Sequence, residues 1–170
     1  MRSFIALPVS DPLSDALTGL QYAVQTGRAV PPDNLHLTLA FLEDQPVEML
    51  EALDQELLCI RAAPFEVAFT GMGAFGRAVH VTADPTPALR ALHDQVVSAC
   101  RRAGLVLPRR RFRPHVTIIR LNHSDRVLST PAVLAAHQLP VMPVSSFALY
   151  QSTLLPGGAR HDVLATYPLG

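Results

Sequence analysis

Apolar residues alternate with small or polar residues in two short stretches of the chain that read almost alike. In the first stretch, DNLHLTLAFL, every second residue from Leu35 to Phe41 is apolar. In the second stretch, RFRPHVTIIR, Val116 and Ile118 hold the corresponding places. Residues two apart in a strand share a face. Each stretch therefore predicts a strand with one face in the core and one face that carries polar side chains.

Apolar residues recur at helical spacing in three longer segments. The first predicted helix begins at Pro12, a favoured residue for the first helical position, and ends before Gly27. The second stripe runs over residues 47–60 and the third over residues 86–103. Spacings of three and four residues are typical of a helix that buries one face.

Shorter alternating runs predict the other strands of the first half. Residues 3–7 form one strand, and the alternating run 65–69 forms another. Gly71 and Gly73 are interpreted as a turn, with a partner strand around residues 79–81.

The second half repeats this plan with a short helix at residues 131–137 and two strands at 144–152 and 163–167, around the turn LPGGAR. Each half thus holds helices, a His-x-Thr strand and a hairpin, as expected of a diverged duplication. Strands that are interspersed with helices and joined as hairpins favour an α+β fold with antiparallel sheets.

Length, composition and charge narrow the classes of protein. A chain of 170 residues favours a single domain over 1–170, or two closely packed lobes. The net charge of zero argues against a dedicated binder of duplex DNA. Cys59 and Cys100 lie in helical patterns, so we expect them to be reduced core residues. We find no signal peptide or membrane span, which predicts a cytoplasmic protein with no membrane partner.

The two His-x-Thr strands carry the candidate chemistry. His36 precedes Thr38, and His115 precedes Thr117, on the polar face of each strand. With ordinary pKa values of about 6.5, one imidazole can be neutral while the other is charged near neutral pH. That pairing suits general base and general acid catalysis on a phosphate ester, with the threonine hydroxyls as phosphate donors. A single such motif usually marks an ordinary polar face, but two copies in corresponding places favour a site.

The stretches NLHLTLAFL and FRPHVTIIR resemble the two signatures of the 2H (two-histidine) phosphoesterase superfamily. The opening RSFIALPV, the segment GMGAFGR and the ending LYQSTLLPGGARHDVLATYPL are similar to its RNA 2′,3′-cyclic phosphodiesterases, also called 2′-5′ RNA ligases. The resemblance implies two pseudo-symmetric lobes with antiparallel sheets flanked by helices around a central groove, and no metal or other cofactor. It implies that His36 donates a proton to the leaving 3′ oxygen and that His115 activates water. Thr38, Thr117 and Arg120 would hold the phosphate, and the product would be a 2′-phosphate.

Two further residues have alternative interpretations. Strict alternation from His115 places Arg120 on the face opposite Thr117, as a solvent-exposed residue at the rim, but a β-bulge would turn it toward the phosphate. Phe112 either stacks on an RNA base or anchors its loop to the core.

The remaining candidates come from charge and from scattered histidines. The arginine run of residues 109–113 either steers RNA toward the groove or is a solvated loop. The family commonly has an aromatic residue in the strand after GAFGR, and His80 stands near that place in this sequence. His80 is a candidate for lining the groove. We expect the other four histidines to lie on the surface. They are His93, His123, His137 and His161.

The leading hypothesis is metal-independent hydrolysis of RNA 2′,3′-cyclic phosphate ends, or of cyclic nucleotides, by a monomer. One alternative is ATP-independent 2′-5′ joining of RNA ends, since a 5′-hydroxyl can replace water in the reverse reaction. Two others are an RNA-binding module without catalysis and hydrolysis of small cyclic phosphodiesters. Turnover of a cyclic nucleotide in the presence of a chelator separates enzyme from binding module.

Overall fold

The computed structural model describes residues 1–125 and 137–170. Within them the chain forms three α-helices, a main antiparallel sheet and a second sheet of two strands. The elements in chain order are β1 (Arg2–Pro8), α1 (Asp11–Val24), β2 (Arg28–Ala29), the short 3-10 helix η1 (Pro32–Asn34), β3 (His36–Asp44), α2 (Val47–Leu58), β4 (Phe65–Val67), β5 (Phe69–Phe75), β6 (Ala78–Ala83), α3 (Pro87–Arg102), β7 (His115–Arg120), β8 (Met142–Val144), β9 (Ser146–Leu155) and β10 (Gly158–Pro168).

The main sheet consists of two lobes that meet at the His-x-Thr strands. Its strand order is β10-β9-β1-β3-β7-β6-β5, with β2 added beside β7. Strands β3 and β7 are joined by the pairing of Leu37 with Val116. We call β1, β3, β9 and β10 the first lobe, and β2, β5, β6 and β7 the second lobe. The expected α+β fold with antiparallel sheets is confirmed.

The two lobes do not correspond to the two halves of the sequence. The hairpin β5–β6 belongs to the first half, yet β6 pairs with β7 of the second half. The hairpin β9–β10 belongs to the second half, yet β9 pairs with β1 of the first half. The halves have exchanged their hairpins, so each lobe is built from both halves of the chain.

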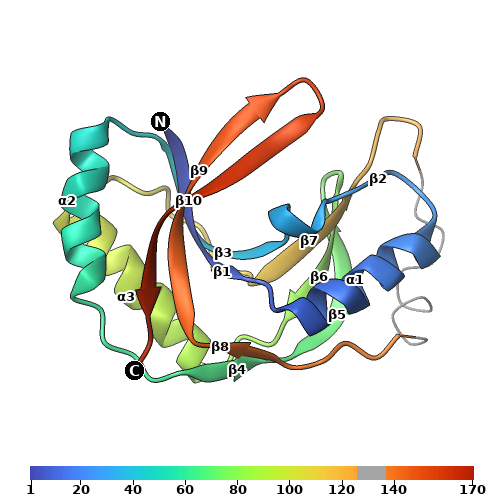
Figure 1. Cartoon of the computed structure of the whole chain (residues 1–170), viewed down its shortest axis with the longest axis horizontal. Coiled ribbons are helices and arrows are strands. Elements are labelled where there is room, and N and C mark those ends of the chain that lie inside the picture. The colour runs from blue at the N-terminus through green and yellow to red at the C-terminus, as the bar shows by residue number, and fades with distance from the viewer. Residues whose placement is uncertain (126–136) are drawn as a thin grey trace.

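The helices lie on both flanks of this sheet (Figure 1). Helix α1 contacts the second lobe, where the Gln21 side-chain amide donates to the backbone oxygens of Ile118 at 2.8 Å and Val30 at 2.9 Å. Helices α2 and α3 pack side by side on the opposite flank of the molecule. The Tyr167 hydroxyl of β10 donates to the Asp54 carboxylate of α2 at 2.6 Å, which ties the end of the first lobe to that helix.

Most predicted elements are present, and one part of the first half needs correction. The run 65–69 is not one strand but splits between β4, which pairs with β8, and β5. Gly71 and Gly73 lie inside β5, and the turn comes later at Gly76, whose positive φ of 58° suits glycine. The predicted helix at residues 131–137 falls almost wholly on residues 126–136, outside the described residues.

The two cysteines differ in their surroundings. Cys100 is buried in the core as expected, but Cys59 is exposed, because α2 ends one residue before it. Both are free thiols. None of the described helices is long and apolar enough to cross a membrane.

Candidate active site

Strands β3 and β7 present their polar residues with the same pattern of burial. In each strand the histidine and threonine of the motif are half-buried, and the residue between them is fully buried. Because Leu37 pairs with Val116, the flanking residues also oppose one another across the two strands. His36 therefore lies opposite Thr117, and Thr38 lies opposite His115. We call this side of the joined sheet the histidine face.

A β-bulge turns Arg120 onto the histidine face. Thr117 pairs with His80 and Ile119 pairs with Val79, so Ile118 is an extra residue without a counterpart on β6. The alternation shifts by one after it, and Arg120 then shares a face with Thr117. The bulge is therefore present, and it places Arg120 on the histidine face with an exposed side chain. That Arg120 binds phosphate stays a prediction.

The same irregularity occurs in β3 and corrects an expectation. Thr38 pairs with Ala6 and Ala40 pairs with Ile5, which leaves Leu39 as the extra residue. Simple alternation predicts Phe41 in the core, but after the bulge it points to the histidine face and is 50% exposed. The corresponding position on β7 is Arg120.

Both histidines are held in the same tautomer by the backbone. The Nδ1 atom of His36 lies 2.7 Å from the carbonyl oxygen of Asn34, and Nδ1 of His115 lies 2.7 Å from that of Arg113. A carbonyl oxygen only accepts hydrogen bonds, so each Nδ1 carries the proton and donates it. The Nε2 atom of each ring is thereby left to accept a proton from a substrate, or to return one.

The surroundings of His36 include a histidine that sequence analysis placed on the surface. The His161 ring lies 5.1 Å from the His36 ring between centroids, and both rings contact Phe4, at 4.9 Å and 4.6 Å. The predicted last strand begins at residue 163, which leaves His161 in a turn. Strand β10 in fact begins at Gly158, so His161 lies within it. The sequence could have revealed this only through a correct prediction of the length of that strand.

A cavity of about 250 Å³ adjoins His36. Tyr150 and His161 contribute to its wall, and the carboxylate-bearing residues Asp11 and Asp33 line it as well. The side of the histidine face next to His36 is therefore partly acidic.

The electrostatic setting of His36 differs from the ordinary one assumed from the sequence. Its pKa is lowered to about 4, first because burial disfavours the charged ring. Positive charge on His161, Arg120 and His115 acts in the same direction, and the bond to Asn34 acts against it. In the free protein His36 is neutral at pH 7.

The surroundings of His115 are aromatic. Its ring lies 4.9 Å from both His80 and Phe75, and those two rings stack on one another at 4.4 Å. The expectation that His80 lies near the site is met, since it is buried against His115. Burial and the charge of His115 lower the pKa of His80. Phe75, which sequence analysis did not single out, is 41% exposed beside this pair.

Phe112 takes the second of its two alternatives. Its half-buried side chain packs against the main core, and its ring stacks on His93 of α3 at 3.9 Å and 9° between planes. The ring contact that could have served an RNA base is thus occupied by the protein. It follows that His93 is half-buried and not a free surface residue.

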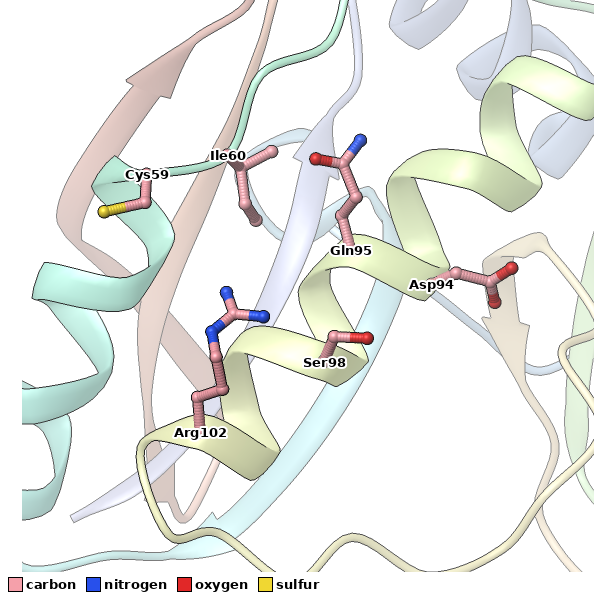
Figure 2. Close-up of a pocket in the computed structure, with 6 residues that line it drawn as sticks. All are labelled: Cys59, Ile60, Asp94, Gln95, Ser98 and Arg102. Carbon is pink, nitrogen blue, oxygen red and sulfur yellow. The ribbon is translucent and has the colours of Figure 1, made fainter.

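A second cavity, of about 330 Å³, lies between the end of α2 and α3 (Figure 2). Its lining includes Ile60, Gln95 and Arg102, and the Arg102 guanidinium is bound to Glu56 at 2.6 Å. None of the residues singled out by sequence analysis for phosphate chemistry line it. Across residues 1–125 and 137–170, no cluster of three His, Cys, Asp or Glu side chains could hold a metal ion.

Comparison with known proteins matches the chain over most of its length. A family profile described as the 2′-5′ RNA ligase superfamily matches residues 9–153. An RNA 2′,3′-cyclic phosphodiesterase of Thermus thermophilus is 33% identical, over 99% of this chain and 90% of its own length. One from Archaeoglobus fulgidus is 29% identical, over 98% and 99%. One from Geobacillus stearothermophilus is 28% identical over 98% of this chain, and the match spans 56% of that longer protein.

Comparison with solved structures also matches the chain over most of its length. The crystal structure of E. coli LigT in its apo form superposes with a TM-score of 0.83 at 28% identity, over 99% of this chain and 96% of that one. LigT has also been crystallised with 3′-AMP, and that structure superposes with a TM-score of 0.80 at 27% identity over the same shares. The MHV ns2 PDE domain shares the fold at 15% identity, with a TM-score of 0.64 over 96% of this chain and 100% of that one.

Proposed function

The chain belongs to the 2′-5′ RNA ligase superfamily, and from that membership we propose that it hydrolyses 2′,3′-cyclic phosphate ends of RNA to 2′-phosphates. The observation that carries this proposal is the pair His36 and His115 on one face, each with Nδ1 bound to a backbone carbonyl and Nε2 left for a substrate. Curated relatives named RNA 2′,3′-cyclic phosphodiesterase support the choice of substrate.

The reaction needs one proton removed and one proton supplied. In our proposal Nε2 of His115 takes a proton from water as the water oxygen attacks phosphorus. The bond from phosphorus to O3′ breaks, and Nε2–H of His36 protonates O3′. The phosphate remains on O2′. His115 then holds a proton that His36 has lost, so the two rings must exchange protons with solvent before the next turnover.

The residues around the pair would hold the phosphate and the base. Thr38 lies beside His115, and Thr117 lies beside His36. In these places the threonine hydroxyls can donate to phosphate oxygens. Arg120 adds a fixed positive charge on the same face. Phe75 stacks on His80 with one face but is 41% exposed, so a base can stack on the part of the ring that remains open. It takes the role first considered for Phe112.

The low pKa of His36 links binding to catalysis. A proton donor with a pKa of about 4 is mostly unprotonated at pH 7. A bound phosphate brings negative charge next to a group surrounded by positive ones, and so favours the protonated ring. We infer that the bound substrate anion raises the pKa of His36. The ring is then protonated and can donate the proton that hydrolysis of this substrate requires.

The same groups can join RNA ends in the absence of water. A 5′-hydroxyl that takes the place of the attacking water would form a 2′-5′ bond, as the name of the family indicates. With no nucleotide hydrolysed, joining lies near balance, and we expect hydrolysis to dominate in dilute aqueous solution. It stays a prediction that the protein is a single-domain monomer of the cytoplasm and that it acts without a metal.

The test is turnover of cytidine 2′,3′-cyclic phosphate and of an RNA octamer with a 2′,3′-cyclic phosphate end, both in EDTA. We expect hydrolysis of both to the 2′-phosphate, identified against 2′- and 3′-phosphate standards. The double variant H36A/H115A is the control for contaminating nuclease. A 3′-phosphate product, or binding of the octamer without turnover, would contradict the proposal and favour a different reaction or an RNA-binding module.

A further inference from the structure

We propose that the loop of residues 109–113, which we call the arginine loop, binds the RNA chain that precedes the cyclic phosphate. The substrate would then be the end of an oligonucleotide in preference to a free cyclic nucleotide. The inference rests on the proposed function and adds the route that the rest of the RNA takes away from the site.

The arginine loop concentrates positive charge that the protein itself does not neutralise. Four of the chain's 14 basic residues fall within these five positions, and all four are exposed. Among the residues that the structure describes, Arg109, Arg110 and Arg111 have no hydrogen-bond or ion-pair partner. Unpaired arginines are available for the phosphates of an RNA backbone.

Other arginines near the histidine face are already in use. Arg28 donates to the backbone oxygen of Gly157 at 3.2 Å, and Arg160 pairs with Asp162 at 3.0 Å. Arg77 contacts the imidazole of His123. Within the described part of the chain, Arg120 is also exposed and unpaired on this face, but the proposed reaction assigns it to the cyclic phosphate itself. For the phosphates of the preceding RNA, the uncommitted cations therefore lie in the arginine loop.

The arginine loop is fixed to the protein and leads directly into the site. Phe112 anchors it by stacking on His93 of α3 at 3.9 Å, while its neighbours Arg111 and Arg113 stay exposed. The carbonyl oxygen of Arg113 holds Nδ1 of His115, and the Arg113 guanidinium lies 6.0 Å from the centre of the Phe75 ring. A nucleotide stacked on Phe75 would thus have the next phosphates beside the arginines.

The opposite side of the site is unsuited to a second phosphate. The cavity beside His36 is lined by Asp11 and Asp33, both exposed, and carboxylates repel a phosphodiester backbone. Charge therefore directs the RNA past His115 along the arginine loop, away from His36.

The experiment measures kcat/KM for the RNA octamer and for cytidine 2′,3′-cyclic phosphate as a function of NaCl concentration. For the wild-type protein we expect a steeper salt dependence with the octamer. In the variant R109Q/R110Q/R111Q, kcat/KM for the octamer should fall at least about tenfold at low salt. The slope of log kcat/KM against log salt should flatten by about 0.7 for each phosphate that the variant no longer binds. Hydrolysis of the mononucleotide should stay within about twofold of wild type.

The matched control is R2Q/R61Q/R90Q, which removes the same charge from exposed positions on other parts of the molecule. We expect it to leave the preference for the octamer and its salt slope intact. Equal salt slopes for octamer and mononucleotide in the wild type would overturn the inference and leave the phosphodiesterase standing. An equal effect of both triple variants, or loss of mononucleotide turnover in the arginine-loop variant, would also overturn it. Absence of turnover with either substrate in the wild type would instead refute the proposed function.

Discussion

At the scale of single residues, the site depends on how far burial, and after it nearby positive charge, lowers the pKa of one imidazole. His36 is half-buried, and the removal of its ring from water, together with charge on His161, Arg120 and His115, holds its pKa at about 4. The free protein is therefore a poor proton donor and a good receptor for an anion. The assignment of His36 as the acid thus requires that a phosphate be bound.

The roles of the two histidines can be separated by the leaving group. Each of His36→Ala and His115→Ala should lower kcat by roughly 10²–10⁴, the usual contribution of one general acid or base. A cyclic phosphate with sulfur in place of O3′ has a leaving group that needs no protonation. We expect this substrate to rescue His36→Ala far better than His115→Ala, measured by steady-state kinetics. Equal rescue, or rescue of His115→Ala alone, would mean that the roles are shared or reversed.

The lowered pKa of His36 also makes the fold sensitive to acid. The unfolded state, with a pKa of about 6.5, takes up a proton before the folded state does as the pH falls. The stabilising contribution is complete above pH 6.5 and is lost as the pH falls toward 4. Between pH 7.5 and pH 5 this residue alone should reduce the free energy of unfolding by about 2 kcal/mol.

In the variant His36→Gln, residue 36 cannot titrate. Between pH 7.5 and pH 5 its free energy of unfolding should therefore fall by about 2 kcal/mol less than that of the wild type. Urea unfolding of both proteins at pH 7.5 and pH 5 measures the difference. His80 and His93 also have lowered pKa values, pack against residues other than His36 and remain in both proteins, so their contributions cancel in the comparison. Identical pH dependence in the two proteins would show that His36 is not perturbed in this way.

At the scale of elements, one extra residue in a strand decides which side chains lie on the histidine face. Leu39 in β3 and Ile118 in β7 are the extra residues, at corresponding places in the two motifs. Each reverses the alternation, so Phe41 and Arg120 share a face with the histidines. Simple alternation from His36 and His115 gives the opposite result for both residues.

Strand β5 makes room for His80 by means of a glycine. A Cβ atom added at Gly73 would lie 3.0 Å from Nε2 of His80, whereas one added at Gly71 would lie 4.0 Å from the nearest atoms of Thr82. His80 cannot easily move, because it is packed between Phe75 and His115. We expect Gly73→Ala to destabilise the protein by roughly 1 kcal/mol and to lower kcat, since His80 would press on His115.

Gly71→Ala is the matched control and should change stability by less than about 0.5 kcal/mol. Introduced together with His80→Ala, Gly73→Ala should no longer be destabilising, because the atom it clashes with is gone. Thermal unfolding and turnover of the cyclic nucleotide provide both readouts. If Gly73→Ala is equally harmful with and without His80, the clash is not its cause.

At the scale of the whole molecule, the exchange of hairpins makes the two halves of the chain interdependent. The hairpin β5–β6 has its sheet partner β7 in the second half, and β1 has its partner β9 there as well. A duplication whose halves folded separately would have kept these pairings within each half.

Fragments 1–104 and 105–170 should therefore be unfolded when produced alone, as judged by circular dichroism. Each lacks strands that its own strands must pair with, and unpaired edges together with exposed core residues do not hold a stable sheet. When the two fragments are mixed and refolded together, they should regain turnover of the cyclic nucleotide. A fragment that unfolds cooperatively by itself would contradict this view of the fold.

The sequence by itself determined most of the elements, the fold class and the two motifs. Helical and alternating periodicity is a local property, and it located the three helices and the strands of His36 and His115. The order His-x-Thr in both strands, with an apolar residue between, placed each histidine and its threonine on one face. That was sufficient to predict a two-histidine site and to identify the family.

Only the tertiary structure decided how these elements are paired and what surrounds the site. The hairpin exchange, the two bulges and the approach of His161 to His36 depend on contacts between residues far apart in the chain, which no local pattern records. For the same reason the pKa of His36 could not be foreseen, since it depends on burial and on charges from three other strand positions. Phe112 shows the limit most simply, because an aromatic residue before the strand of His115 suits a base or a core equally well, and its packing on His93 decides between them.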